Sequence, residues 1–378
     1  MENRQRILFY NDSAIFGGHE VMTLRIVRDL LQAKFSICFM FYASNQRLSE
    51  ELELLMRNFE SLTLLPTPLR SGHLQSIMSF FQWSSLYRLY RLVRGRFDLI
   101  CASQGNIELS SKILIVARLA QIKLVSYIPG DFLPSELKLP LMWLRDKFAR
   151  FLFRLPSAYI SISLTFVAGL QRKYNVASNR VYLLENVLDK IDLPLLNNRC
   201  RTLPVRFLMV GAVNSIKNQQ FMLDWLECNP NYPAELVLVG CGPLLLEMKQ
   251  RVMRSTALCK RVQFYGWRDD TLQIMTKMDL LVLPSLVEGV PLVMLEAAAL
   301  KLPMLATNAY GMADFLPIEM RFKCNDQNDF SRKLESLLIN SAHTQTLIEQ
   351  NYQQVLRYND NKAFSNKISA IFEDLLNT

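Results

Sequence analysis

Short apolar runs alternate along the chain with longer segments whose apolar residues recur every three or four positions. The short runs are rich in Val, Ile, Leu and Phe and predict β-strands, while the longer segments predict helices. Near-continuous apolar strands separated by helices are typical of parallel sheets that are covered on both faces. The predicted strands are 6–10, 35–42, 61–65, 97–103, 122–127, 158–163 and 181–185, followed by 205–211, 235–240, 262–266, 279–284, 303–307 and 320–323.

Thirteen strands are too many for one comfortable open sheet. The polar segment DLPLLNNRCRTLP, residues 192–204, has no clear period and lies between the two groups of strands. The last segment, 361–378, carries apolar residues at helical spacing and predicts an amphipathic helix. We therefore expect an α/β protein with two doubly wound, Rossmann-like domains, residues 1–195 and 196–360, followed by a C-terminal helix.

Composition narrows the class of protein. The chain has 378 residues, of which half are apolar and a fifth are charged, and this is enough to fill two cores. Its seven cysteines include no C-x-x-C pair, so we expect reduced thiols and no zinc site. The N-terminal segment lacks the features of a signal peptide, and no apolar run reaches the ~18–20 residues of a membrane span. We expect a soluble protein or one that lies on a membrane surface.

Positive charge is concentrated in the first half. Residues 1–190 contain 24 Lys and Arg against 15 Asp and Glu, whereas residues 191–378 contain 19 of each. Two segments there, 77–97 and 141–155, interleave aromatic residues with arginines. This pattern suits an anionic membrane surface, although a helix with aromatic residues in the core and solvated arginines would show it too. The segments match no nucleic-acid recognition module, so we expect no nucleic-acid partner.

Three loops that follow predicted strands are candidates for anion binding, because ligands of open α/β sheets bind at the carboxyl ends of the strands. Gly17 and Gly18 precede a predicted helix, Lys217 follows the strand 205–211, and the turn GCGP occupies 240–243. Each of these three features also has an explanation that involves no ligand. The glycines would also serve a turn that needs positive φ, the lysine would also be solvated, and GCGP would also be a structural turn.

The segment PSLVEGVPLVMLEAAALKLPMLAT, residues 284–307, holds two carboxylates in apolar surroundings. Pro291 suits the first position of a helix that runs to about Leu300, so Glu288 falls in the preceding loop and Glu296 within the helix. The helix N-terminus between them favours negative charge. A carboxylate, an anion site and a second carboxylate fit a sugar nucleotide, which presents sugar hydroxyls, a diphosphate and ribose hydroxyls. Alternatively, Glu288 is a helix N-terminal carboxylate and Glu296 belongs to a partly buried ion pair.

The order of these segments resembles the retaining glycosyltransferases of family 4, which have the GT-B fold. The second domain of that family reads GR-x4-K, then G-x-G-P, then PS-x2-EG-x-P-x3-LEA. The corresponding segments here are GAVNSIK at 211–217, GCGP at 240–243 and PSLVEGVPLVMLEA at 284–297. Glu288 and Glu296 match the E-x7-E pair of the family. LLENVLD, residues 183–189, is similar to the turn that precedes the second domain.

The resemblance implies a retaining transfer of a sugar from a UDP- or GDP-linked donor to a saccharide acceptor, lipid-linked in the biosynthesis of cell-surface polysaccharide or lipopolysaccharide. Residues 1–195 would bind the acceptor, 196–360 would bind the donor across a central cleft, and the helix 361–378 would cross back to the first domain. No metal or other cofactor is implied. The protein would act on the cytoplasmic face of the cell membrane, as a peripheral membrane protein.

The resemblance also implies roles for single residues. Glu288 would hold hydroxyls of the donor sugar and Glu296 those of the ribose, while Lys217 and the amides around Gly17 and Gly18 would bind the diphosphate. The further substrate-binding residues implied are Gly266 and Trp267 beside the base, together with Gly289, Val290 and Leu292.

Two departures from the family pattern leave a second hypothesis open. Ala212 occupies the position of the family's phosphate-binding arginine, and SYIPGDF offers Asp131 where the family often has a histidine. Asp131 is therefore the third candidate catalytic residue, beside Glu288 and Lys217. The alternative is a catalytically weak sugar-nucleotide-binding partner subunit of a glycosyltransferase complex. A non-hydrolysing epimerase fits less well, because its histidine-bearing motifs are absent from the sequence.

Overall fold

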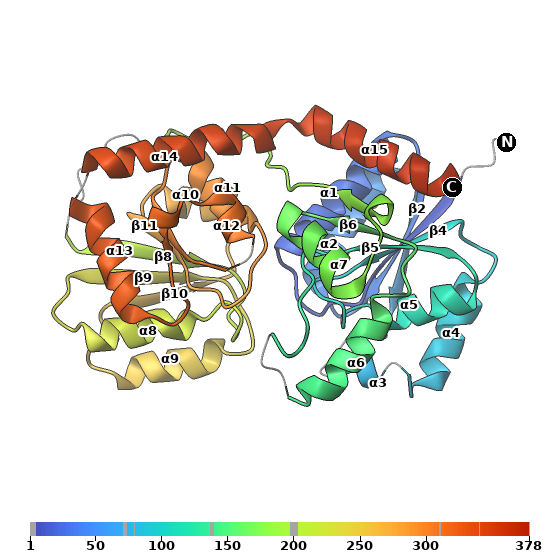
Figure 1. Ribbon diagram of the computed structural model, residues 1–378, viewed down its shortest axis with the longest axis horizontal. Helices are drawn as coiled ribbons and strands as arrows, with labels where there is room; N and C mark the ends of the chain where they lie inside the picture. Colours follow the sequence, from blue (N-terminus) through green and yellow to red (C-terminus); the bar gives the residue numbers. More distant parts are fainter. Residues whose placement is uncertain are drawn as a thin grey trace. The chain divides into compact units, whose positions relative to one another are not determined.

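The computed structural model describes residues 5–70, 74–78, 80–136, 140–196, 203–309, 311–339 and 341–377, and the chain forms two compact units (Figure 1). Unit 1 comprises Met1–Glu185 and Lys362–Thr378, and unit 2 comprises Asn186–Asn361. The chain thus enters unit 2 after Glu185, whereas the sequence pattern predicts a boundary after residue 195. Part of the predicted linker, residues 197–202, lies outside the described residues.

Unit 1 contains a seven-stranded sheet in the order β3-β2-β1-β4-β5-β6-β7, and all its paired strands are parallel. Each strand overlaps one of the seven that the apolar runs predict. The strands are β1 (Arg6–Asn11), β2 (Ser36–Tyr42), β3 (Leu62–Thr67), β4 (Leu99–Ser103), β5 (Lys123–Tyr127), β6 (Ala158–Ser161) and β7 (Val181–Leu183).

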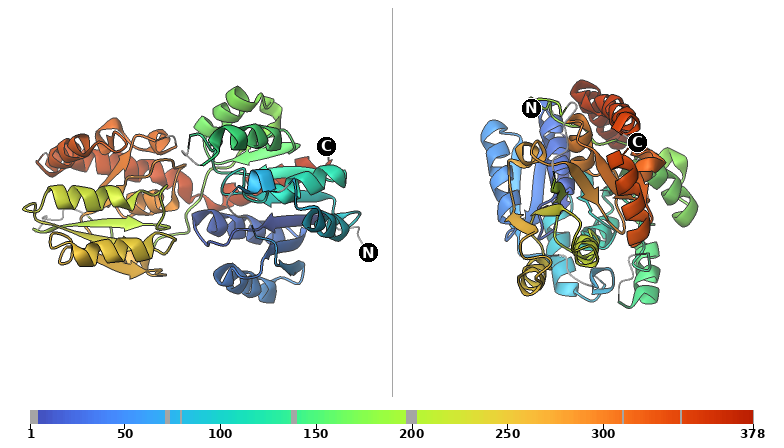
Figure 2. Two further views of the ribbon diagram at one scale, coloured as in Figure 1. Left: turned by 90° about the horizontal axis from the view of Figure 1, so that it is seen from below. Right: turned by 90° about the vertical axis from the view of Figure 1, so that its left-hand side faces the viewer.

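The helices of unit 1 cover both faces of this sheet (Figure 2). Local signals set their starts. The Ser163 side chain accepts the amide of Phe166 at the start of α7, and Glu20 accepts the amide of Gly17 at the start of α1. The helices are α1 (Gly18–Gln32), α2 (Gln46–Asn58), α3 (Gln75–Met78), α4 (Trp83–Val93), α5 (Ser111–Leu119), α6 (Met142–Leu152) and α7 (Leu164–Tyr174).

Unit 2 contains a six-stranded parallel sheet in the order β10-β9-β8-β11-β12-β13. Its strands match the remaining six predictions: β8 (Val205–Val210), β9 (Ala234–Val239), β10 (Val262–Gly266), β11 (Leu280–Leu283), β12 (Met304–Thr307) and β13 (Arg321–Phe322). The helices are α8 (Gln219–Cys228), α9 (Leu245–Arg254), α10 (Thr271–Met275), α11 (Leu292–Ala299), α12 (Met312–Phe315), α13 (Gln327–Ile339) and α14 (Ser341–Val355).

The last helix, α15 (Asn361–Asn377), packs on unit 1 (Figure 1). Its Phe372 ring stacks on Phe9 of β1 with 5.8 Å between centroids. Lys123 Nζ donates to the Leu375 carbonyl at 2.7 Å, and Ser365 donates to Asp29 at 2.7 Å. The apolar face predicted from the sequence is therefore buried against the first sheet.

Both sheets reverse their strand order at one point, between β1 and β4 in unit 1 and between β8 and β11 in unit 2. At such a switch point the loops after the two central strands run to opposite faces and leave room for a ligand. In the described part of the chain, no helix is long and apolar enough to cross a bilayer. Six of the seven cysteines lie in that part, and all six are free thiols.

Candidate functional site

The loops after β8 and β11 meet at the switch point of unit 2. The Leu286 amide donates to the Ile216 carbonyl at 2.8 Å, and Asn218 Nδ2 donates to the Pro284 carbonyl at 3.1 Å. These bonds hold the loop that carries Lys217 against the loop that carries Glu288. Two candidate residues that are 71 positions apart in the sequence are thereby brought together.

Lys217 and Glu288 form an ion pair between Nζ and Oε2. Ser285 Oγ donates to the same carboxylate oxygen at 3.2 Å, and Asn214 Oδ1 accepts the Lys217 amide at 2.9 Å. The side chains of Lys217 and Glu288 remain 24% and 16% exposed, so a ligand can reach both. The alternative of a merely solvated lysine is wrong, since Lys217 has a defined partner at the carboxyl edge of the sheet.

Glu288 lies in the loop before α11, as predicted. Pro291 is the N-cap residue and the helix begins at Leu292, one position later than the pattern indicates. Leu292 and Val293 have no intrahelical acceptor for their amides, because four amides at every helix start lack one. Together with the helix dipole, these amides form an electropositive spot beside the Lys217–Glu288 pair.

The half-buried carboxylate of Glu296 has no hydrogen bond or ion pair with any residue in the described ranges, so the predicted alternative of a structural ion pair fails for those residues. Burial raises its pKa from an ordinary value of 4.5 to about 7. A desolvated carboxylate without a partner is costly, and donors from a ligand would remove that cost.

The backbones of the loops after β8 and β9 approach so closely that only glycine fits. Gly240 has φ of +136°, and a Cβ there would lie 2.0 Å from the Gly211 carbonyl oxygen. A Cβ on Gly242 would lie 2.3 Å from the Val213 carbonyl oxygen. The close backbone contacts therefore explain why the turn GCGP contains glycines at 240 and 242. The same contacts shape the loop that leads to Lys217.

Gly289 and Val290 connect Glu288 to the helix, and residues that periodicity did not single out support them. Asn186 Nδ2 donates to the Val290 carbonyl at 2.8 Å, and Asn186 is buried. Gly311 packs on Gly289, since a Cβ on Gly311 would lie 2.7 Å from the Gly289 carbonyl carbon. Asn186 is identifiable in the sequence only through its family-like turn, and Ser285 only as the residue after the strand-ending proline.

Gly266 and Trp267 lie at the carboxyl end of β10, the edge strand of the same sheet. Trp267 is 46% exposed, and Gly266 has φ of +66°. The Gly266 carbonyl accepts the Gly240 amide at 2.6 Å, which joins this turn to the GCGP turn. Both residues lie on the edge of the sheet that carries Lys217 and Glu288, two strands away from β8, and their role at the base stays a prediction.

The remaining candidates lie in unit 1. Gly17 caps α1 with extended φ of −153°, and Gly18 is the first helical residue, so neither serves a turn with positive φ. Asp131 is buried and pairs with Lys173 at 3.1 Å. Burial raises the pKa of Asp131, and the Lys173 ammonium offsets part of that rise. The catalytic role of Asp131 and the diphosphate-binding role of the two glycines stay predictions.

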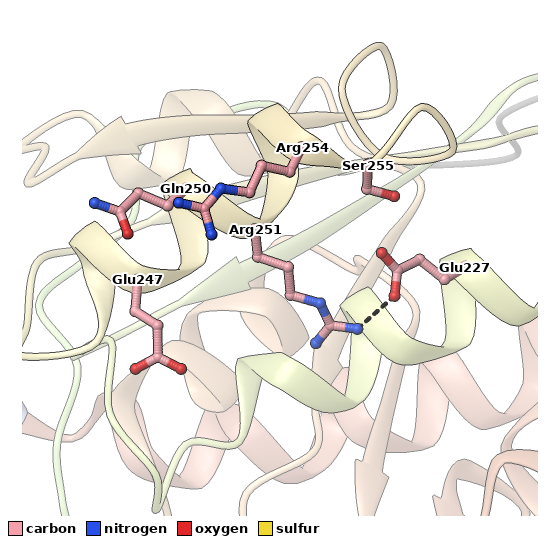
Figure 3. A pocket seen from close by; sticks show the side chains of 6 residues that line it. All are labelled: Glu227, Glu247, Gln250, Arg251, Arg254 and Ser255. Carbon is pink, nitrogen blue, oxygen red and sulfur yellow. Dashed lines mark hydrogen bonds and ion pairs between the residues drawn. The ribbon is translucent and has the colours of Figure 1, made fainter.

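A surface hollow between α8 and α9 is separate from all the predicted site residues (Figure 3). Figure 3 shows Arg251 of α9 reaching Glu227 of α8, and its guanidinium also pairs with Asp224 at 2.6 Å. The bond from Arg251 holds the pKa of Glu227 below its usual value. Two carboxylates neutralise Arg251, so the hollow would bind an anion only weakly. We interpret it as an ion-pair cluster that joins α8 to α9.

Comparison with known proteins finds a family match within unit 2. Residues 204–340 match the family described as "Glycosyl transferases group 1". Residues 204–340 form a group 1 glycosyltransferase domain. The match covers β8 through α13, and therefore includes Lys217, Glu288 and Glu296.

Beyond this domain, the chain is similar to known glycosyltransferases and to a polysaccharide biosynthesis protein. The Escherichia coli UDP-Gal:α-D-GlcNAc-diphosphoundecaprenol α-1,3-galactosyltransferase is 29% identical over 244 residues, which cover 60% of this chain and 62% of the relative. The chain spans less than two thirds of the length of the curated relatives that it matches. The matched regions cover 62%, 38% and 18% of these relatives. One of these relatives, the Salmonella typhi Vi polysaccharide biosynthesis protein VipC/TviE, is 32% identical to this chain over 108 residues.

Solved structures match over the whole chain. Anabaena HepE in complex with UDP-glucose is 18% identical and superposes with a TM-score of 0.74, covering 98% of this chain and 100% of HepE. The lipopolysaccharide glycosyltransferase WaaG superposes with a TM-score of 0.70 at 15% identity, covering 97% of this chain and 99% of WaaG. These matches confirm the predicted GT-B fold, and the family match confirms the predicted resemblance. No comparison favours the alternative of a catalytically weak partner subunit.

Proposed function

We propose that the protein is a retaining glycosyltransferase that moves a sugar from a UDP-linked donor to a lipid-linked saccharide in the biosynthesis of a cell-surface polysaccharide or lipopolysaccharide. The observation that carries this proposal is the Lys217–Glu288 pair at the start of α11, with the desolvated carboxylate of Glu296 further along the same helix. A UDP-linked donor is favoured over a GDP-linked one because the E. coli relative is named for UDP-Gal and HepE was solved with UDP-glucose.

The chemistry that these residues offer is stabilisation of a leaving diphosphate. Negative charge develops on the diphosphate as the bond to the sugar stretches, and preorganised cations and amides stabilise it. Lys217 and the amides of Leu292 and Val293 at the start of α11 would supply such groups. Without a donor, Glu288 neutralises Lys217. With a donor, Lys217 would turn to the diphosphate and Glu288 would accept hydroxyls of the sugar.

Glu296 would accept the ribose hydroxyls. Its position within the helix, after the amides that face the diphosphate, matches the order of groups in a sugar nucleotide. The hydroxyl donors would replace the water that Glu296 loses on burial, so the ionised carboxylate becomes favourable once the nucleotide is bound.

A transfer assay tests the proposal. UDP-galactose, UDP-glucose and GDP-mannose would each be offered with a synthetic GlcNAc-diphosphate alkyl ester, and the product detected by mass spectrometry. The anomeric configuration of the product, read by NMR, tests retention. If the purified full chain neither transfers nor hydrolyses any of the UDP-sugars, the proposed function fails.

The side chain of Glu296 gives a prediction that links stability and binding. Its pKa in the folded chain is raised from 4.5 to about 7, so the unfolded chain releases this proton first and the free energy of unfolding falls as pH rises from about 4.5 to about 7. Glu296→Gln is expected to raise the free energy of unfolding at pH 8 by up to about 2–3 kcal/mol, at ~1.4 kcal/mol per pKa unit, with a much smaller effect at pH 5. Melting temperatures at the two pH values measure this difference. The same change is expected to weaken UDP binding, measured by calorimetry at pH 8.

The control for Glu296 is Glu247→Gln on the exposed side of α9, which should change neither quantity. Wild-type UDP affinity should also fall as pH drops below 7, because the ligand must displace a proton from Glu296. A Glu296→Gln variant that binds UDP as tightly as wild type would remove Glu296 from the binding site.

Support for a membrane-bound acceptor comes from a surface of unit 1. We define the aromatic–basic surface as the exposed aromatic, aliphatic and basic side chains of 81–94 and 141–154. Phe80 joins the two segments, since its ring packs on Phe148 and Phe151 of α6 at 5.0 and 5.7 Å between centroids. Figure 1 shows α3, α4 and α6 along the lower edge of that unit. Its exposed members are Phe81, Trp83, Tyr87, Arg88, Arg91, Arg94, Leu141, Met142, Trp143, Lys147, Arg150, Phe151 and Arg154.

The aromatic residues of this surface are not core residues. Trp83 is 73% exposed and Trp143 is 64% exposed, while the buried face of α4 consists of Leu86, Leu89 and Val93. The alternative of a helix whose aromatic residues face the core is therefore wrong for both tryptophans. Aromatic side chains interleaved with cations suit the interface of an anionic bilayer, where each cation contributes about 1 kcal/mol.

Replacing Arg88, Arg91 and Arg94 together by glutamine is expected to reduce vesicle binding strongly, because all three are exposed on α4 and at its end. Sedimentation with vesicles of phosphatidylglycerol and phosphatidylcholine measures the bound fraction. Binding of the wild type should weaken at 1 M salt, where screening shortens to about 3 Å.

The matched control replaces three exposed cations of unit 2 by glutamine, namely Arg254, Lys260 and Lys277, with the same loss of charge. That variant should sediment like the wild type, and UDP affinity should be equal in all three proteins. Equal sedimentation of the two triple variants would assign the effect to net charge alone. A wild type that stays in the supernatant at low salt would remove the membrane from the proposal.

A further inference from the structure

A closed hydrogen-bond network spans the switch point of unit 1, between the end of β1 and the end of β4. Ser103 Oγ is its centre and has three partners: Asn11 Nδ2 at 3.2 Å, Thr23 Oγ1 at 2.7 Å and His19 Nε2 at 2.9 Å. Asn11 Nδ2 also donates to Glu20 Oε1 at 3.4 Å. These residues come from β1, α1 and β4, so the network joins three elements around the turn of Gly17 and Gly18.

The network fixes the position of the proton on His19. Thr23 Oγ1 donates its single proton to the His19 carbonyl at 2.8 Å, so it must accept from Ser103. The Ser103 hydroxyl therefore donates its proton to Thr23 Oγ1 and can only accept a hydrogen bond from His19. The proton of the His19 ring consequently lies on Nε2, and Nδ1 carries a lone pair.

The ring is held in place and is neutral. It stacks on Tyr127 of β5, with 4.9 Å between centroids and 21° between planes. Burial lowers the pKa of His19 from 6.5 to about 3. The ring therefore stays an uncharged hydrogen-bond acceptor at physiological pH.

His19 Nδ1 is buried and has no partner among the described residues. An unsatisfied buried acceptor calls for a ligand or a bound water. The atom belongs to the second residue of α1, directly after the exposed Gly18, at the point of the sheet where ligands of open α/β folds bind. The outer atoms of the network also have partners, since Glu20 Oε2 accepts the Gly17 amide and Asn11 Oδ1 accepts the Ser13 amide. Among the described residues, His19 Nδ1 is therefore the buried side-chain atom of this network that is left for a ligand.

We propose that His19 is a substrate-binding residue whose Nδ1 accepts a hydrogen bond from a hydroxyl of the acceptor saccharide. This inference rests on the proposed function, because it takes the ligand of unit 1 to be a saccharide. Ser103 is then a positioning residue, which selects the tautomer that leaves Nδ1 free. A hydroxyl donor suits this site better than an anion, since a lone pair would repel a phosphate oxygen.

The variant His19→Gln separates the two ring nitrogens. A glutamine amide reaches about as far as Nε2 and can still donate to Ser103, but it offers no acceptor at the place of Nδ1. The Michaelis constant for the GlcNAc-diphosphate ester is expected to rise roughly tenfold, the scale of one lost hydrogen bond. UDP affinity and the melting temperature are expected to stay near those of the wild type. Equal Michaelis constants in the variant and an active wild type would overturn the inference and leave the proposed function intact.

Nitrogen-15 NMR of the histidine-labelled full chain tests the inference without any variant activity. The chain has three histidines, and His19→Gln assigns the signal of the one in question. We expect a neutral ring with the proton on Nε2 between pH 6 and 8, and a change of the Nδ1 resonance when the GlcNAc-diphosphate ester is added. UDP alone should leave that resonance unchanged. A proton on Nδ1, or an Nδ1 resonance that ignores the ester, would show that Nδ1 is occupied internally or by water.

Discussion

Glu288→Gln is expected to lower the rate of sugar transfer about 100-fold or more, the scale of losing one group that stabilises the transition state. Glutamine keeps the size of the side chain and can still accept from Ser285, but it carries no charge to hold the sugar hydroxyls. UDP affinity is expected to stay equal or to rise, because Lys217 loses its internal partner and is free for the diphosphate. Steady-state transfer assays and calorimetry with UDP measure the two quantities.

The two carboxylates of the site serve as controls for each other. Glu288→Gln should change transfer and spare nucleotide affinity, whereas Glu296→Gln should weaken the nucleotide itself. If both variants lower UDP affinity to the same extent, the division between sugar and ribose is wrong. Glu227→Gln, in the ion-pair cluster between α8 and α9, should leave transfer unchanged and controls for loss of a surface carboxylate.

Lys217→Ala is expected to weaken UDP binding by about 1.5–3 kcal/mol, which is the range for a hydrogen bond to a charged group. No arginine supports it at position 212, where the chain has Ala, so the loss should not be compensated there. Calorimetry with UDP measures the effect, and Lys277→Ala on the exposed surface is the matched control. Unchanged UDP affinity in Lys217→Ala would reduce the residue to a structural partner of Glu288.

A double variant separates binding from stability. Lys217→Ala alone leaves Glu288 half-buried without its cation, so the melting temperature should fall as well. Lys217→Ala combined with Glu288→Gln should recover part of that stability, because the unpaired charge is gone, but it should not recover UDP affinity. Recovery of both would mean that the affinity loss arises from the free carboxylate and not from the missing ammonium.

The sequence was sufficient for the elements and for the order of the site residues. All thirteen strands overlap a predicted run, because the apolar runs of a buried parallel strand are local and need no knowledge of neighbours. The start of α11 was predicted to within one residue by Pro291, whose ring fixes φ and which lacks an amide hydrogen. The placement of Glu288 before that helix and Glu296 inside it follows from the same local signal.

Pairing between distant residues was decided only by the tertiary structure. Lys217 meets Glu288 because β8 and β11 are neighbours in the sheet, and strand order is not encoded in any local pattern. The two aromatic–basic segments form one surface because Phe80 reaches α6, and the proton on His19 is fixed because Ser103 of β4 lies beside β1. Sequence periodicity reports which side of an element is buried, whereas these contacts depend on which elements the folded chain brings together.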